Sequence, residues 1–335
     1  MVQHFSSCEF EKRDEEAETL LWMVWGIIGI LLMGAAVLFC CALGLFRFAA
    51  VRHAPRHWEN EPMPDGIPRR WANAIHEGRA YLKSRPDKED WFCQSGDGLR
   101  LHAAYYPAPQ PSDQTVVAVH GFRADGATGF AMMVKFYHGA GCNVLLVDDR
   151  AHGESEGKYI GFGWLDKDDV LLWLAEVQAH TPGVRILLHG ISMGAATVLM
   201  TAGSDALPVC VKGVVSDCAY ASAWEEFSYQ IRCVLHLPVF PLLQCVNLLN
   251  RCLAKYDFHR ADTTAFTARI RVPVLFFHGE RDTYVPTQMV HTLYGACAAE
   301  KTLLLVPEAG HAQSYAADSA AYEEAVCALL QKVFA

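Results

Sequence analysis

A serine lies in a short glycine-flanked motif that is typical of an exposed nucleophile. Residues 190–194 read GISMG, a GxSxG pattern that ends the apolar run RILLHG and is followed by AATVLM. Where such a motif joins a buried strand to a helix, its glycines allow a sharp turn that leaves the serine exposed, and the helix N-terminus beneath it favours negative charge. The sequence therefore predicts Ser192 as a nucleophile.

A serine hydroxyl needs a base to take its proton and an acid to orient that base. Asp282 lies in the segment GERDTYVP after the apolar run VPVLFFH, and His311 lies in EAGH after LLLVP. Both residues are thus expected in loops at strand ends. The chain order of Ser192, Asp282 and His311 matches the nucleophile, acid and base order of triads built on such strand ends.

Two neighbouring residues compete for these roles. Asp217 also follows an apolar run, VKGVVSD, and is the alternative acid. Asp282 is preferred because it is expected in a loop before a helix and its spacing to His311 suits the general triad. Cys218 is an alternative nucleophile, but it has no base nearby in sequence and is predicted to be a buried thiol.

Backbone amides near the serine are expected to stabilise negative charge on a substrate oxygen. The N–H of Met193 follows the serine directly, and the N–H of Phe122 follows the apolar run TVVAVH. We predict these two amides as an oxyanion hole. His120 is expected to brace this loop rather than to transfer protons, because a triad uses a single base.

Apolar runs alternate with amphipathic stretches along most of the chain. This alternation predicts a mainly parallel sheet covered by helices on both faces, an α/β fold. Two further short strands around SGDG, 91–94 and 99–106, are expected to form a hairpin before the sheet. The predicted strands are 115–120, 142–148, 185–190, 211–217, 272–278 and 301–306, and the predicted helices are 127–139, 165–180, 192–203, 286–298 and 314–334.

The connection between the fourth and fifth of these strands is about fifty residues long and must carry structure of its own. Its apolar positions recur at helical spacing around Pro238 and Pro241, so a helical cap is predicted at about 219–268. Cap residues Trp224, Phe227, Tyr229 and Phe240 are expected to line an apolar entrance or, equally, to pack the cap onto the sheet.

A long apolar segment near the N-terminus predicts a membrane anchor. Residues 20–46 carry no charge, and as a helix of about 1.5 Å per residue they would span roughly 40 Å. A cleaved signal peptide is disfavoured because the preceding residues are acidic and the apolar run is too long. The predicted organisation is a tail at 1–19, a transmembrane helix at 20–46, a juxtamembrane linker at 47–88 with a short helix near 71–82, and a domain at 89–335.

Composition excludes several other classes of protein. The chain has 335 residues, of which 52% are hydrophobic, and this composition argues against disorder. Its net charge of −9 argues against nucleic-acid binding, because the phosphates would need a basic surface. Nine of the 12 cysteines follow the apolar segment, an odd number without a CxxC pair, which favours a reducing compartment. The arginines at 47, 52 and 56 follow the apolar segment, and basic residues next to a span favour the cytoplasmic side. They therefore also predict a cytoplasmic domain on a single-pass anchor.

Over roughly residues 90–335 the chain resembles α/β-hydrolase-fold serine hydrolases. The resemblance rests on GISMG, GERDTYVP, the terminal GH at 310–311, HGF at 120–122, and DRAHGES at 149–155. This last segment is similar to the D-x-R-G-H-G-x-S stretch of membrane-anchored and lipase- or peptidase-like members, with Ala151 in place of the first glycine. The resemblance implies a lipase or esterase, or an enzyme of serine aminopeptidase-like or prolyl-oligopeptidase-like type.

Together these observations predict a membrane-anchored serine hydrolase that cleaves an acyl bond through an acyl-enzyme. Its expected partners are a small acyl substrate, first an ester or a lipid-like molecule, and the lipid bilayer. No metal or organic cofactor is required. A peptidase is the first alternative, with Glu225 and Glu226 binding an amino group, and a non-catalytic binding module on the same fold is the second.

Overall fold

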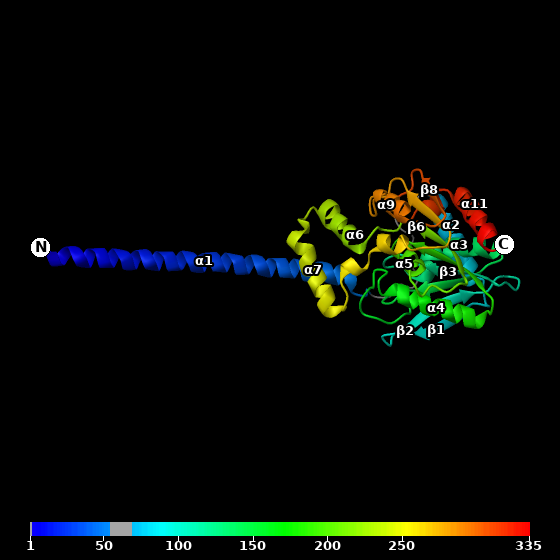
Figure 1. The fold of residues 1–335 in the computed structure, drawn as a ribbon, viewed down its shortest axis with the longest axis horizontal. Helices are drawn as coiled ribbons and strands as arrows, with labels where there is room; N and C mark the ends of the chain where they lie inside the picture. Colours follow the sequence, from blue (N-terminus) through cyan, green and yellow to red (C-terminus); the bar gives the residue numbers. More distant parts are fainter. Residues whose placement is uncertain (1, 54–68) are drawn as a thin grey trace.

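A single twisted sheet forms the centre of the domain. A computed structural model of the chain describes residues 2–53 and 69–335, and within them eight strands pair in the order β1-β2-β4-β3-β5-β6-β7-β8 (Figure 1). The β1–β2 and β2–β4 pairs are antiparallel and all other pairs are parallel. The strands are β1 Glu89–Gln94, β2 Arg100–Tyr106, β3 Gln114–Val119, β4 Asn143–Asp148, β5 Arg185–Ile191, β6 Val211–Asp217, β7 Val274–Gly279 and β8 Lys301–Val306.

The central strands are buried on both faces, which explains their continuous apolar sequences. In β4, for example, Leu145 and Val147 pack into one apolar cluster, whereas Val144 and Leu146 pack into another on the opposite face. This arrangement confirms the predicted α/β-hydrolase fold, with the predicted hairpin as β1 and β2 and the six predicted strands as β3 to β8.

Helices cover both faces of the sheet. Side chains of α4 (Asp166–His180), α5 (Met193–Ala202) and α9 (Gln288–Ala296) belong to the first cluster. Side chains of α2 (Arg69–Lys83), α3 (Gly126–Gly139), α10 (Ser314–Ala317) and α11 (Ser319–Val333) belong to the second. The helix predicted at 314–334 is divided at Asp318, because the carboxylate of this residue accepts a hydrogen bond from Ala321 N and so caps α11.

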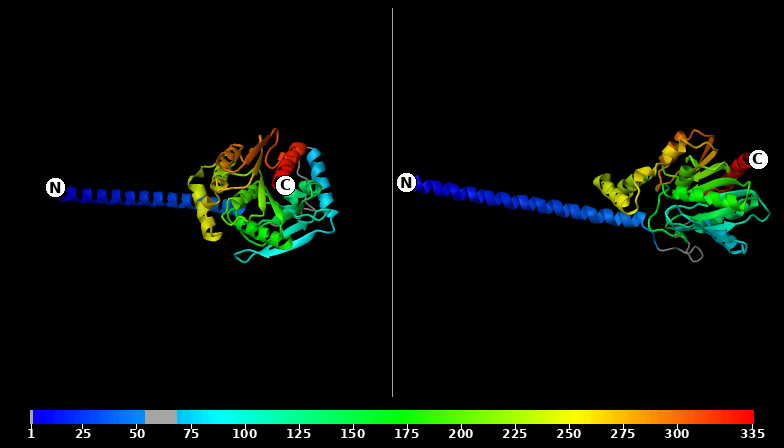
Figure 2. Two further views of the ribbon diagram at one scale, coloured as in Figure 1. Left: turned by 45° about the vertical axis from the view of Figure 1, so that its right-hand side comes forward. Right: turned by 60° about the horizontal axis from the view of Figure 1, so that its bottom comes forward.

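The segment after β6 carries helices, as expected for a cap. It contains α6 (Ala223–Tyr229), a π-helical turn at Gln230–Val234, α7 (Val239–Leu253) and the short α8 (Thr263–Thr267). Two further views place α6 and α7 on the side of the domain from which the N-terminal helix projects (Figure 2).

The N-terminal helix α1 (Val2–Ala50) runs further than the sequence suggested. Its stretch Glu18–Ala50 is long and apolar enough to cross a membrane, but the apolar run does not end in a free linker at residue 47. Ala42, Phe46 and Ala50 are buried on one side of the helix against the domain, and α1 contacts α7. The Arg52 guanidinium then donates to the carbonyls of Gly153 and Ser155. Residues 54–68 of the predicted linker lie outside the described residues, and α2 includes its predicted short helix.

Candidate active site

Ser192 occupies a strained turn between β5 and α5. Its φ of 56° and ψ of −116° lie outside the usual regions for an L-residue. The flanking glycines are required by space, because a Cβ on Gly190 would lie 2.2 Å from the carbonyl oxygen of Gly194, and a Cβ on Gly194 would lie 2.0 Å from that of Val119. The close approach of three backbone segments thus holds the serine at the end of the strand, as the motif predicts.

The three residues predicted as a triad lie together at the ends of three strands. The Ser192 hydroxyl, after β5, is 2.8 Å from Nε2 of His311, which lies in the loop after β8. Nδ1 of His311 lies 2.8 Å from Oδ2 of Asp282, in the loop after β7. With Nδ1 protonated, Nε2 is free to accept the serine proton, so the arrangement has the connectivity of a nucleophile, base and acid.

Asp282 is held ionised by its surroundings. Its Oδ1 accepts hydrogen bonds from the amides of Tyr284 at 2.9 Å and Val285 at 2.8 Å. Burial opposes the ionised form, but hydrogen bonds from His278 and His311 outweigh it and hold the pKa of Asp282 well below its ordinary range. An ionised carboxylate at this point fixes the tautomer and the orientation of the His311 ring.

Asp217, the alternative acid, faces another partner. Its carboxylate accepts a hydrogen bond from the Ser314 hydroxyl at 2.7 Å, and its backbone carbonyl accepts one from the Ser192 amide at 2.8 Å. Burial raises the pKa of the Asp217 carboxyl. Asp217 therefore supports the turn that carries the nucleophile, whereas Asp282 is the aspartate hydrogen-bonded to His311.

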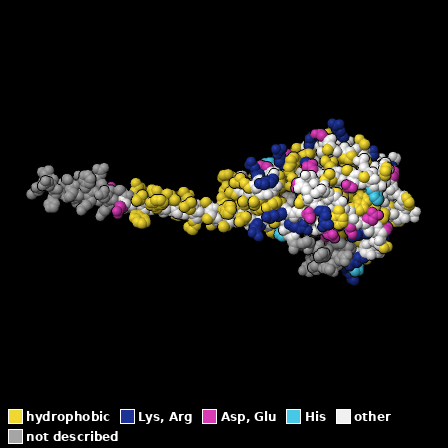
Figure 3. Space-filling view, turned by 90° about the horizontal axis from the view of Figure 1, so that it is seen from below, with side chains coloured by type: hydrophobic (Ala, Val, Ile, Leu, Met, Phe, Trp, Pro, Cys, Tyr) yellow, Lys and Arg dark blue, Asp and Glu magenta, His cyan; other side chains and the backbone are white. Residues whose placement is uncertain are grey.

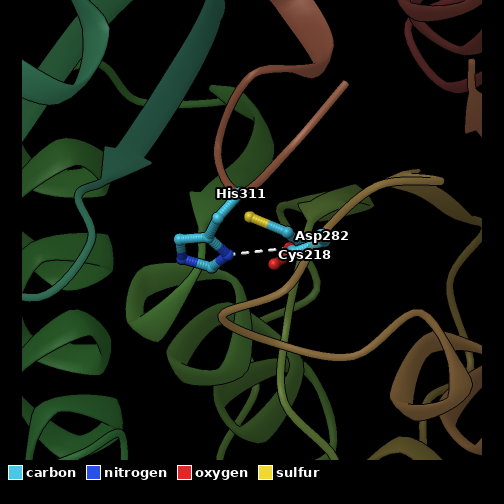
Figure 4. Close-up of side chains that lie close together, drawn as sticks. All are labelled: Cys218, Asp282 and His311. Carbon is cyan, nitrogen blue, oxygen red and sulfur yellow. Dashed lines mark hydrogen bonds and ion pairs between the residues drawn. The ribbon is translucent and has the colours of Figure 1, made fainter. Parts of the chain in front are cut away.

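Cys218 lies close to the triad but is suited to packing. Figure 4 shows its side chain beside Asp282 and His311, and its Sγ lies within 4.8 Å of their ligand atoms. The thiol is buried, and burial together with the charge of Asp217 raises its pKa well above the ordinary range. Because the thiolate is the reactive form, this environment suppresses nucleophilic chemistry.

The loop predicted to supply an oxyanion donor lies directly against the serine. A Cβ on Gly121 would lie 3.3 Å from Cβ of Ser192, which places the neighbouring Phe122 at the site. His120 is fully buried, its Nδ1 donates to the Gly121 carbonyl at 2.7 Å, and its Nε2 accepts from the Asp149 amide at 3.1 Å. His120 thus braces the loop, as predicted. On the other side of the serine, Met193 begins α5.

The segment after β4 is tied to the rest of the domain by ion pairs of Arg150. Arg150 donates to both carboxylate oxygens of Asp169, at 2.6 and 2.8 Å, and its guanidinium also lies 3.0 Å from Asp97. Ala151 has a φ of 62°, the left-handed region that favours glycine, and it takes the place of the first glycine in the D-x-R-G-H-G-x-S stretch that this segment resembles. The alanine that replaces this glycine therefore has a backbone conformation that favours glycine.

A cavity of about 470 Å³ opens beside Ser192. Of the four cap aromatics proposed to line an entrance, only Phe227 does so. Trp224 stacks on His259, Tyr229 donates to the Thr283 carbonyl, and Phe240 is exposed. The walls are mostly apolar and come from the oxyanion loop, the cap, the Asp282 loop and, unexpectedly, the end of α1.

Glu226 is a cavity residue whose state sequence reasoning did not foresee. The side chain is buried, Oε1 accepts a hydrogen bond from Gln230 Nε2 at 2.7 Å, and Oε2 has no hydrogen-bond partner. Burial raises its pKa to about 8. In the sequence, Glu226 is marked only as one of two adjacent acidic residues. In the structure the two differ, because Glu225 is exposed whereas Glu226 lines the cavity.

Comparisons with known proteins agree with the fold. Residues 110–264 match a family described as serine aminopeptidase, S33. The chain is 31% identical over 227 residues to the Bacillus subtilis (strain 168) protein YqkD. The aligned residues cover 66% of this chain and 72% of YqkD. The chain belongs to the α/β-hydrolase family. This α/β-hydrolase is also 23% identical over 248 residues to the α/β-hydrolase domain-containing protein WAV2 of Arabidopsis thaliana, covering 73% of this chain and 79% of WAV2.

Solved structures show the same fold. The Pyrococcus furiosus esterase Pf2001 superposes on this α/β-hydrolase with a TM-score of 0.63 and 19% identity, covering 86% of this chain and all of the esterase. Acetyl xylan esterase 1 from a Thermoanaerobacterium species superposes with a TM-score of 0.54 and 18% identity, covering 88% of this chain and 99% of that enzyme.

Proposed function

We propose that this chain is a membrane-anchored serine hydrolase that cleaves carboxylic esters. The observation that carries the proposal is the continuous relay from Ser192 through His311 to Asp282, with both hydrogen bonds at 2.8 Å, at the wall of an apolar cavity. Hydrolase family membership and the fold shared with esterases support the same chemistry.

In the proposed mechanism, Oγ of Ser192 attacks the acyl carbon while Nε2 of His311 takes the hydroxyl proton. The negative charge on the substrate oxygen is stabilised by the amides of Phe122 and Met193. The bond from the acyl carbon to the alkoxy oxygen then breaks, and the alcohol leaves with the proton from His311. Water, activated by the same histidine, hydrolyses the acyl-enzyme and restores Ser192, so that no cofactor takes part.

The composition of the cavity favours an ester over a peptide. A free amino terminus needs an ionised partner, and the cavity wall offers one buried carboxyl, Glu226, whose pKa is raised by burial to about 8. Glu225, the other residue considered for this role, is exposed outside the cavity wall. An uncharged acyl group therefore suits these walls better than a charged peptide end.

The proposal is tested by labelling with a fluorophosphonate probe and by hydrolysis of p-nitrophenyl esters of graded chain length, comparing the wild type with Ser192→Ala. We expect labelling and ester turnover in the wild type and neither in the variant. Labelling without ester turnover would move the assignment to amide substrates. No labelling of a folded wild-type protein would overturn the catalytic proposal and favour a binding module.

We further propose that α1 anchors the protein and that the domain faces the cytoplasm. The described cysteines are free, which suits a reducing compartment. Cys252 is exposed on α7 and reports sidedness directly. A membrane-impermeant thiol reagent should modify it in broken cells but not in intact cells. Modification of Cys252 itself in intact cells would place the domain on the outer side, whereas modification of Cys8, on the other side of the span, would not.

A further inference from the structure

The last turns of α1 form part of the cavity wall. Leu45, Phe48 and Ala49 line the same cavity as Ser192. Two of them, Leu45 and Ala49, are four residues apart and so lie on one face of the helix. The segment proposed as a membrane anchor therefore also completes the site.

Burial divides α1 into two parts along its length. From residue 20 to residue 41 every side chain is exposed except that of Leu38, which is half-buried, and this stretch of 22 residues measures about 33 Å. That length matches the hydrocarbon core of a bilayer. From Ala42 onward the helix packs on the domain. With the exposed stretch spanning the hydrocarbon core, the cavity wall at residues 45–49 falls in the headgroup layer.

The cap presents exposed apolar side chains next to this wall. Val234, Leu235, Leu237 and Phe240 are all exposed, Phe240 by 74%, and we call these four residues the cap tip. Val234 and Leu235 also line the cavity, so one side of the cavity is formed by the cap tip itself. Apolar side chains exposed next to each other are costly in water and mark a surface that binds an apolar partner.

The cap tip and the exposed stretch of α1 lie at the same end of the molecule. The cap lies at the end of the domain from which α1 projects, and its helix α7 contacts α1 (Figure 1, Figure 2). Hydrophobic side chains continue from α1 onto the adjoining end of the domain (Figure 3). A bilayer crossed by α1 would therefore meet the cap tip as well, and this continuity favours the bilayer over a second protein as the apolar partner.

We propose that the cap tip inserts into the bilayer that α1 spans and that the cavity takes a long acyl chain of a membrane lipid ester directly from it. This inference rests on the proposed ester hydrolase function and specifies its substrate class. The acyl carbon would sit at Ser192, the chain would lie against the end of α1 and the cap, and the alcohol would leave after acyl transfer to the serine. The cavity volume of about 470 Å³ is in the range of small-molecule sites.

The test uses the full chain reconstituted in phosphatidylcholine vesicles and two esters with the same leaving group. p-Nitrophenyl palmitate is presented in the vesicles, and p-nitrophenyl acetate in solution. Leu237→Glu and Phe240→Glu place charge on cap-tip residues outside the cavity wall, so we expect the ratio of palmitate to acetate kcat/KM to fall at least tenfold. Val209→Glu is the matched control, because Val209 is an 87% exposed valine before β6, at the opposite ends of the strands from the site, and should leave the ratio unchanged.

A second pair of variants tests the wall on α1. Ala49→Phe adds a ring on the face that lines the cavity and should lower the palmitate to acetate ratio at least tenfold, whereas Ala35→Phe adds the same ring in the exposed stretch and should not. Fluorophosphonate labelling of every variant establishes that the site is intact.

The outcomes separate this inference from the proposed function. Acetate turnover that depends on Ser192, with ratios unchanged in the cap-tip and Ala49 variants, would overturn the inference and leave the ester hydrolase. Absence of turnover and of fluorophosphonate labelling in the wild type would overturn both.

Discussion

Oδ2 of Asp282 lies 2.8 Å from Nδ1 of His311, although 29 residues separate the two along the chain. The other oxygen of the same carboxylate is occupied by two backbone amides. The carboxylate is therefore held by the backbone of its own loop, and its second oxygen orients the histidine ring.

Asp282→Asn should lower kcat for ester hydrolysis on the order of 10³- to 10⁴-fold, because an amide in this position no longer favours the tautomer that accepts the serine proton. Asp217→Asn is the matched control: its carboxylate meets Ser314, so we expect it to retain most of the activity. Steady-state kinetics with a soluble ester measures both. If Asp217→Asn abolished turnover and Asp282→Asn did not, the acid would have to be reassigned.

Gly194→Ala should destabilise the protein by about 1–3 kcal/mol or more and abolish labelling of Ser192. The added methyl group would lie 2.0 Å from the Val119 carbonyl oxygen, so the turn at the nucleophile has to move. Gly139→Ala is the control, because a Cβ there has no neighbour within 4 Å. Chemical denaturation in detergent together with fluorophosphonate labelling checks the pair, and a normally labelled Gly194→Ala protein would contradict the argument.

Glu226 should make the stability of the domain depend on pH. Burial raises the pKa of its carboxyl from 4.5 to about 8, so the folded state retains a proton that the unfolded chain loses over this window. Glu226 therefore contributes its full stabilisation below pH 4.5 and loses it as the pH rises towards 8. The loss is at most a few kcal/mol, since one pKa unit corresponds to about 1.4 kcal/mol.

Glu226→Gln removes this titration while keeping the shape of the side chain. The difference in unfolding free energy between the variant and the wild type should shift in favour of the variant as the pH rises from 4.5 to 8. Denaturant titrations at several pH values in detergent measure it. A difference that stays constant across this range would show that the carboxyl is not protonated in the folded protein.

Arg150→Met should cost about 3–5 kcal/mol of stability, because it leaves the carboxylate of Asp169 buried without its cation. Arg251→Met removes an exposed cation from its pair with the half-buried Asp257 and should cost at most about 1 kcal/mol. Denaturant titrations measure the unfolding free energy of both variants. Similar losses of unfolding free energy would contradict the argument that the buried pair contributes more than the more exposed one.

Local patterns were sufficient to predict the sheet, the helices that cover it and the order of the triad residues. Strands buried on both faces need continuous apolar runs, and a nucleophile at a tight turn needs glycines beside it, so both leave short-range signals in the sequence. The same reasoning placed Ser192, Asp282 and His311 at strand ends, and the parallel arrangement of β5, β7 and β8 brings those ends together.

The sequence by itself determined the α/β fold, the serine motif and the presence of an apolar N-terminal helix, because each is a matter of residue type and spacing within one segment. Only the tertiary structure decided which aspartate reaches His311, which of the cap aromatics faces the cavity, and that the end of α1 forms part of the cavity wall. These outcomes depend on packing between segments far apart in the chain, and the burial that separates Glu226 from its neighbour Glu225 exists only once α6 lies on the domain.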